Sequence, residues 1–249
     1  MCIRDRRPTT VSYRHGLIAA AAAPAPTPLP PIAGEELRIS TPTDDGNYGA
    51  PDPLSFDETS QQLLYATCAP LLGYPDSAGP RGAELTPEVA AAMPSISDGG
   101  RTYTFHIRPG FRFSPPSNEP VTAETFRHSL ERELSPKNQF SPGPQFASDI
   151  AGLAAYRAGT SAHISGIRVR GNRLSITLVK PAGDFLTRLS MSAFCPVPLS
   201  IPVHSKHYLT VPPSSAGPYY VSTVQGDRTV LLRNRTTTAP GLAAPSGWC

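Results

Sequence analysis

The sequence lacks any apolar run near the ~20 residues that a bilayer-spanning helix requires, and it carries little net charge. Its 22 Lys and Arg residues exceed its 19 Asp and Glu residues by only three. Residues 1–15 hold four Arg and one Asp, and 4 − 1 = +3, so the rest of the chain is neutral overall. A neutral body without a Lys/Arg run lacks the electrostatic footprint that the phosphate backbone of a nucleic acid requires. We therefore exclude nucleic acid as a partner.

Motifs of the common catalytic sites are also missing, since the chain has no G-x-S-x-G, Walker loop or H-E-x-x-H. His204 and His207 stand at i, i+3 near Cys195, a spacing open to metal binding, but neighbouring prolines predict a loop there. Asp44 and Asp45 could form an acid/base pair, although an Asp-rich turn is the commoner meaning. We expect no enzyme activity, no metal and no cofactor.

Proline is abundant, with 30 residues, and many of them lie near the N-terminus. Residues 16–23 are apolar, follow basic residues and lead into a Pro-rich stretch at 24–31. This order leaves two interpretations open for residues 1–33, a degraded export signal or a disordered leader. In either case we expect residues 1–33, like residues 236–249, not to pack on the body of the protein.

From Gly34 onward, helical and strand patterns alternate. Apolar residues alternate with polar ones at 102–108, which predicts a half-buried strand. Thr122 is a preferred N-cap residue ahead of apolar residues at helical spacing, which are Phe126, Leu130 and Leu134. We expect strands at 36–40 and 102–108, hairpins at 167–178 and 219–232, and helices at 59–72, 87–93, after Thr122, at 146–158 and from about 183. This mixture predicts an α+β (mixed α/β) fold.

Three segments in order resemble family 5 of the extracellular solute-binding proteins, the dipeptide, oligopeptide and nickel type. They are residues 85–113 continued at 120–132, SAGPYYV at 215–221, and LLRN at 231–234. The resemblance implies a type II periplasmic-binding fold, in which a solute is held between two lobes. It also implies a small peptide or similar solute as ligand, an ABC permease and ATPases as partners, and an extracytoplasmic location.

After Asn234 the sequence departs from the family pattern. We expect residues 34–234 to form the first lobe and residues 235–249 to be an aberrant tail, so that the lobe is incomplete. Loss of one base would convert a family-like Asn-Pro-Tyr into Asn-Arg-Thr, the residues found at 234–236. With a single lobe, we expect peptide binding to be weak, because one face of the ligand would stay in solvent.

Cys68 and Cys195 are the two cysteines within the expected lobe. They could be buried free thiols that behave as small apolar groups. By analogy with exported domains we expect them instead to form a disulfide, which would close a loop of 195 − 68 = 127 residues.

Candidate ligand residues lie where loops leave strands, because rigid elements there can present side chains to a cleft. They are Asp44, Asn47, Tyr48, Ser192 and Phe194. The alternative is that Tyr48 packs on the surface and Phe194 fills the core. We expect a substrate-binding component of an ABC transporter, with a secreted, disulfide-stabilised interaction or receptor domain as the alternative. Neighbouring permease and ATPase genes would favour transport.

Overall fold

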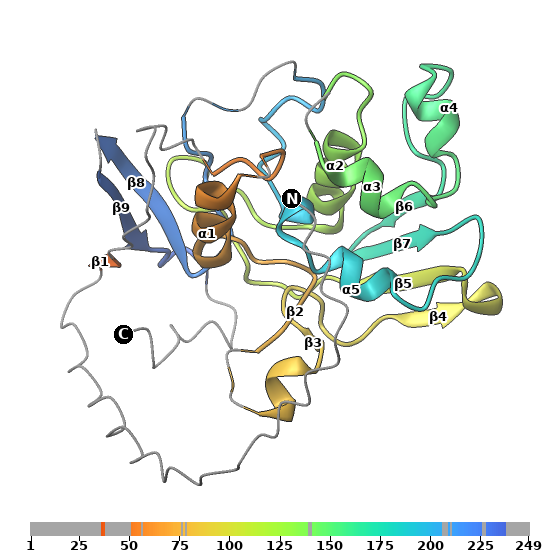
Figure 1. Ribbon diagram of the computed structural model, residues 1–249, viewed down its shortest axis with the longest axis horizontal. Helices are drawn as coiled ribbons and strands as arrows, with labels where there is room; N and C mark the ends of the chain where they lie inside the picture. Colours follow the sequence, from red (N-terminus) through yellow and green to blue (C-terminus); the bar gives the residue numbers. More distant parts are fainter. Residues whose placement is uncertain are drawn as a thin grey trace, which may run out of the picture. The chain divides into compact units, whose positions relative to one another are not determined.

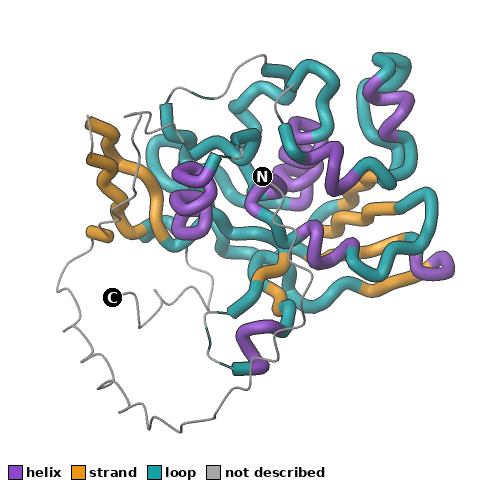
Figure 2. Tube along the Cα trace, in the orientation of Figure 1, coloured by secondary structure: helices purple, strands orange, loops and turns teal. Residues whose placement is uncertain are grey.

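The computed structural model describes residues 36–37, 51–55, 57–75, 77, 79–138, 141–205, 209, 211–225 and 228–237 (Figure 1). All of them belong to one unit, Gly34–Ser246. The helices are α1 (Glu58–Thr67), α2 (Ala123–Glu133), α3 (Gly143–Ala147), α4 (Leu153–Arg157) and α5 (Phe185–Leu189), with 3-10 turns η1 (Pro80–Ala83), η2 (Asp98–Gly100) and η3 (Ser192–Phe194). The strands are β1 (Glu36–Leu37), β2 (Leu72–Gly73), β3 (Thr86–Pro87), β4 (Ser95–Ser97), β5 (Thr102–His106), β6 (Ile167–Arg170), β7 (Arg173–Thr177), β8 (Tyr219–Gln225) and β9 (Arg228–Arg233). The fold is therefore mixed α/β, with loops between short elements (Figure 2).

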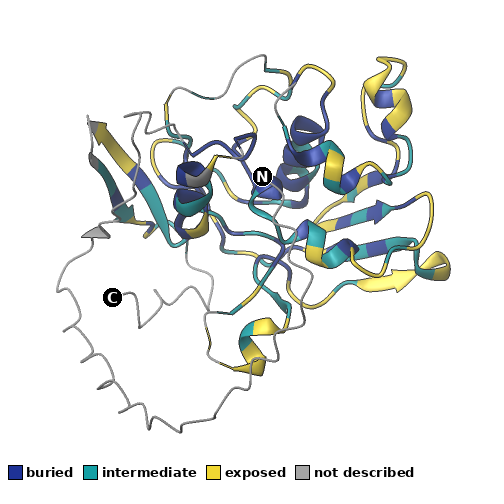
Figure 3. Cartoon of the chain, viewed as in Figure 1, coloured by how far each residue is buried: buried dark blue, intermediate teal, exposed yellow. Residues whose placement is uncertain are grey.

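The larger sheet is antiparallel, with the strand order β4-β5-β7-β6. Its inner face follows the predicted alternation, since Tyr103 and Phe105 are buried and pair with Ile176 and Leu174. Helix α2 packs against β6 and β7. Figure 3 shows the buried residues concentrated on α2 and in these central strands. The main core therefore lies between α2 and the sheet.

The start of α2 confirms the predicted cap. The Thr125 backbone N–H donates to Thr122 Oγ1 at 3.3 Å, and the Thr122 N–H donates to Thr125 Oγ1 at 3.1 Å. This reciprocal pair satisfies two donors that a helix start otherwise leaves free. Phe126, Leu130 and Leu134 are buried, as their spacing predicts.

The smaller sheet has the order β1-β9-β8, and its β8–β9 hairpin matches the predicted one. β1 covers only Glu36–Leu37 of the expected strand, because residues 38–40 lie outside the described part. Leu63 and Ala66 of α1 form a small core with Val221 and Leu231 of this hairpin. Helix α1 also contacts η3, so it connects the hairpin to the segment that carries Ser192.

Two helix predictions around residue 70 are wrong. The helix expected at 59–72 ends at Thr67, and Cys68 is extended with φ −83° and ψ 151°. Pro70 follows two residues later, and a proline disfavours helical backbone before it. The helix expected at 87–93 is absent, since Thr86–Pro87 pairs with Leu72–Gly73 as a strand. The Ala91 N–H, which in a helix over 87–93 would bond to the carbonyl of residue 87, donates instead to His106 O at 2.8 Å.

The single helix expected at 146–158 is two short helices, α3 and α4. Gly152 lies between them with φ 81°, a left-handed conformation that glycine adopts easily. The chain turns there because Ala151 N–H donates to Thr177 O at 2.9 Å, at the end of β7. A contact with the sheet therefore overrides the helical pattern.

Candidate functional site

The predicted ligand residues fall into two groups. Asp44, Asn47 and Tyr48 lie outside the described residues. Ser192 and Phe194 belong to η3. Phe194 is 2% exposed and packs in the main core, which is the packing role weighed above. Ser192 is half-buried and stays a predicted ligand contact.

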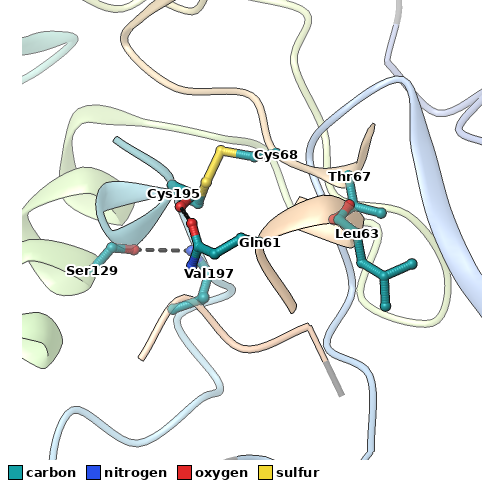
Figure 4. The surroundings of a disulfide bond; sticks show 8 residues. Gln61, Leu63, Thr67, Cys68, Ser129, Cys195 and Val197 are labelled. Atoms are coloured by element: carbon teal, nitrogen blue, oxygen red, sulfur yellow. Dashed lines mark hydrogen bonds between the residues drawn. A yellow bond between two sulfur atoms is a disulfide. The ribbon is translucent and has the colours of Figure 1, made fainter. Parts of the chain in front are cut away.

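A disulfide joins Cys68, at the end of α1, to Cys195, directly after η3 (Figure 4). The two Cα atoms are 5.6 Å apart, within the range that disulfide geometry requires. The structure thus contains the pairing that the sequence predicts. It ties Ser192 and its neighbours to α1 across 127 residues of sequence.

Gln61 reinforces this junction. Its Nε2 donates to Ser55 O at 2.9 Å, and its Oε1 accepts a hydrogen bond from Ser192 Oγ. Two residues after Cys195, the Val197 N–H donates to Ser129 Oγ of α2 at 2.9 Å (Figure 4). One glutamine therefore holds the segment before α1 and the segment that carries Ser192 in fixed relation.

Asp57 caps the start of α1 by accepting from Ser60 N–H at 2.9 Å. Partial burial would by itself raise the pKa of Asp57. Hydrogen bonds from Ser55 and Ser60 outweigh that effect and leave this pKa below its ordinary value. The cap therefore stays ionised at neutral pH, where its negative charge suits a helix N-terminus.

Asp52 and Arg132 form a bidentate ion pair, with Nη1–Oδ1 and Nη2–Oδ2 distances of 2.7 and 2.8 Å. Both side chains are at most 1% exposed. The Asp52 carboxylate also accepts from Leu54 N–H at 3.1 Å and Leu209 N–H at 2.9 Å. Residue 52 follows the loop that carries the first group of predicted ligand residues. The pair therefore anchors the described segment 51–55 to α2.

Two residues of the family-like segments have packing roles. Gly217 N–H donates to Thr67 O at 2.8 Å, and a Cβ atom on residue 217 would lie 2.4 Å from Thr67 C. Only glycine allows this approach of the chain to the end of α1. The Asn234 Nδ2 group lies 3.1–3.2 Å from the carbonyl oxygens of Arg112, Ser215 and Gly217. Gly217 and Asn234 therefore hold neighbouring segments of the chain together.

The first residues of the expected tail contact the body, so that prediction is wrong for them. Thr236 Oγ1 donates to Phe113 O at 2.8 Å, and Thr237 Oγ1 donates to Arg112 O at 2.9 Å. Threonine hydroxyls provide these bonds, which no apolar periodicity could predict. Residues 238–249 and the expected leader, residues 1–33, lie outside the described residues.

The described part of the chain shows neither a metal-binding cluster nor a membrane-spanning helix. It contains no group of three or more His, Cys, Asp or Glu side chains able to hold a metal ion. His204 instead contacts Ser135, with an Nδ1–Oγ distance of 2.8 Å, while His207 is not among the described residues. No helix in the described ranges is long and apolar enough to span a bilayer.

This architecture matches part of the structures of periplasmic binding proteins. The peptide-binding pheromone receptor PrgZ superposes with a TM-score of 0.65 at 26% identity, over 80% of this chain and 39% of that one. NikA from Brucella suis, solved with Fe(III)-EDTA, gives a TM-score of 0.63 at 21% identity, over 82% and 36% of the two chains. The fold thus defines the class as a solute-binding protein.

The chain belongs to the bacterial extracellular solute-binding proteins, family 5, whose middle-region profile matches residues 84–237. The family is non-enzymatic, and its match continues past Asn234 into the expected tail. The probable deoxycholate-binding periplasmic protein YgiS of Escherichia coli K12 is 32% identical over 183 residues. That similarity covers 72% of this chain and 32% of the relative, so the chain spans about a third of the length of YgiS.

Proposed function

We propose that this chain is the first lobe of an extracytoplasmic peptide-binding protein that delivers its ligand to an ABC importer. The observation that carries the proposal is the likeness to PrgZ over 80% of the chain, because that receptor is described by its mode of peptide binding. The periplasmic relative in Escherichia coli supports the extracytoplasmic location. The ABC permease and its ATPases are the proposed partners.

In this proposal, the peptide contacts Ser192 in η3 and the predicted ligand residues Asp44, Asn47 and Tyr48, which lie outside the described residues. The Cys68–Cys195 disulfide and Gln61 hold η3, and the Asp52–Arg132 pair holds the described segment 51–55. Rigid supports of this kind reduce the loss of conformational freedom on binding. A second lobe closing over the peptide would bury most of its surface and strengthen its polar contacts by excluding water. Affinity therefore depends on both lobes.

Calorimetric titration of the complete secreted protein that contains this chain tests the ligand class. The titrants are a pool of short peptides, deoxycholate and Fe(III)-EDTA, chosen to match the ligands named for the similar proteins. We expect saturable binding of peptides alone. Saturable binding of only deoxycholate or only the metal chelate would overturn peptide specificity and leave the family assignment intact.

Ser192→Ala tests the predicted contact within η3. Loss of one hydrogen bond to a bound peptide should weaken binding roughly two- to tenfold. The matched control is Gln61→Ala, because it removes the hydrogen bond between Ser192 Oγ and Gln61 Oε1 but keeps the Ser192 hydroxyl. Equal peptide affinity for both variants would remove Ser192 from the binding surface.

The partner assignment has a separate test. If the protein serves an importer, deleting the permease gene beside it should abolish peptide uptake while secretion and peptide binding persist. Unchanged uptake after this deletion would favour the alternative of a secreted receptor domain, and so would the absence of any neighbouring transporter gene.

A further inference from the structure

The four-stranded sheet has an outer face that points away from α2, and this face contains no acidic or apolar residue. It is defined by alternate residues of β4, β5, β7 and β6. On β5, β7 and β6 their neighbours along the strand pack towards the core, whereas Ile96 of β4 is 53% exposed. Its members are hydroxyl residues (Ser95, Ser97, Thr102, Thr104, Ser175, Thr177) and basic residues (His106, Arg168, Arg170, Arg173). The four strands together contain no Asp or Glu.

The basic residues lie at one end of the outer face, in register. His106 pairs directly with Arg173, and Arg173 pairs with Arg170 on the next strand. Since neighbouring strands are about 4.8 Å apart, these three residues span only ~10 Å. Arg168 lies one row away, opposite Ser175. All four basic residues are exposed.

No ion pair in the described structure neutralises these four basic residues. None of the ion pairs among the described residues involves His106, Arg168, Arg170 or Arg173. The Arg168 Nε group donates to a carbonyl oxygen, Ser165 O, at 3.3 Å. Like charges directly opposite each other on antiparallel strands are destabilising. The pairing of Arg170 with Arg173 therefore slightly lowers the stability of the folded state unless an anion lies nearby.

Protection of a sheet edge does not explain the whole row. Charged residues on an edge strand prevent pairing with other chains, and this accounts for Arg168 and Arg170 on β6. Arg173 and His106, however, lie on the two interior strands, β7 and β5. The positive charge of Arg173 on an interior strand therefore needs another explanation.

The rest of the outer face is polar. Thr102 Oγ1 lies 3.1 Å from Thr177 Oγ1, and Thr104 Oγ1 lies 3.1 Å from Ser175 Oγ. The buried aromatic anchors that dominate stable protein–protein interfaces are lacking on this face. A flat layer of phosphate groups suits it better, because arginine forks and hydroxyls both hydrogen-bond phosphate oxygens.

We propose that the outer face of the β4-β5-β7-β6 sheet docks reversibly on anionic phospholipid headgroups. The arginines provide the attraction and the hydroxyls form hydrogen bonds at the surface. Near an anionic membrane each arginine contributes roughly fivefold to binding, so three arginines give a weak association that salt disrupts. This proposal is independent of the solute that the protein binds.

Co-sedimentation of the full chain with vesicles tests the proposal. One set contains about 30% phosphatidylglycerol in phosphatidylcholine and the other phosphatidylcholine alone, each at about 20 mM and about 0.5 M NaCl. The test variant is Arg170→Gln/Arg173→Gln. The matched control is Arg81→Gln/Arg233→Gln, which removes the same charge from exposed residues of η1 and β9. The charge of +3 in residues 1–15 is present in every variant and cancels in the comparison.

We expect binding only to the phosphatidylglycerol vesicles at low salt, with the outer-face variant weakened roughly tenfold to thirtyfold and the control much less. The outer-face variant should keep or slightly raise the melting temperature, because it relieves like-charge repulsion, so lost folding would not explain its loss of binding. Equal binding by the two double variants would overturn the proposal. So would the absence of vesicle binding by the unmodified chain, an outcome that favours an acidic protein as partner.

Discussion

Arginine has opposite roles in two regions of this molecule. Around Asp52, Arg132 is buried and its guanidinium is paired through two hydrogen bonds. On the outer face of the four-stranded sheet, Arg170 and Arg173 are exposed, adjacent and without an ion pair among the described residues. The same side chain therefore ties segments together in one region and leaves its charge available at the surface in the other.

The difference lies in what water does for each charge. A buried ion has lost its hydration, so removing its partner is strongly destabilising. An exposed arginine keeps its hydration and its charge is screened by salt, so its neighbours change stability little. The buried Asp52–Arg132 pair should therefore affect folding, whereas the arginines of the outer face should affect association.

The largest expected effect comes from the Cys68–Cys195 disulfide, which joins the end of α1 to the residue after η3. Replacing both Cys68 and Cys195 by Ser should lower the free energy of unfolding by up to about 5 kcal/mol, the chain-entropy value for so long a loop. Chemical denaturation of the variant and the unmodified protein measures this change. Hydrogen exchange should rise in α1 and η3 before it rises in β5. A uniform rise in exchange across all elements would show that α1 and η3 do not unfold separately from the four-stranded sheet.

Next is the buried ion pair. Asp52→Asn leaves the Arg132 guanidinium buried without a counter-charge and should cost about 3–5 kcal/mol of stability. The matched control is Asp98→Asn, because Asp98 pairs with Arg101 at 2.7 Å but both side chains are more than 40% exposed. The control should change stability by less than about 1 kcal/mol. Similar losses in the two variants, measured by urea denaturation, would contradict the contrast between the two regions.

A smaller, pH-dependent effect is expected for Glu133, at the end of α2. Burial raises the pKa of Glu133 to about 8, although the hydrogen bond from Ser141 Oγ at 2.6 Å and the charge of Arg132 oppose this. Asp52 adds to the rise. Since the folded pKa exceeds the unfolded value, the protonated form stabilises the fold below about pH 4.5, and this stability is lost as the pH rises to about 8.

Glu133→Gln should remove that dependence, because its amide does not ionise and can still accept from Ser141. At pH 7 the variant should be more stable than the unmodified protein by about 3 kcal/mol, and the two should be similar near pH 4.5. Melting curves between pH 4 and 9 measure the difference. Parallel pH profiles for the two proteins would mean that Glu133 is ionised in the folded state.

Local patterns predicted the sheet and α2 well. Alternation at 102–108 and the Thr122 cap involve residues close together in the sequence, and the structure contains both features. Around residue 70 the same reasoning failed, because strand pairing between residues 72–73 and 86–87 outweighs the local preference for helix. Propensity is a weak prior that tertiary contacts override.

The candidate site was predictable only in part. Cys68 and Cys195 could be paired from the sequence because they were the two cysteines within the expected lobe. The Asp52–Arg132 pair could not be found in this way, since its partners are 80 residues apart and Asp52 lies outside the family-like segments. Family-like segments pointed to the class of protein, whereas their residues Gly217 and Asn234 proved to be packing positions.

The sequence by itself determined the class of fold, the family resemblance and the disulfide, because these depend on the order and type of residues along the chain. Only the tertiary structure decided that Arg132 is buried against Asp52 and that His106, Arg173 and Arg170 form one exposed row. Strand register and helix packing bring such residues together across long sequence separations. Their electrostatic environment, and with it their role, therefore exists only in the folded chain.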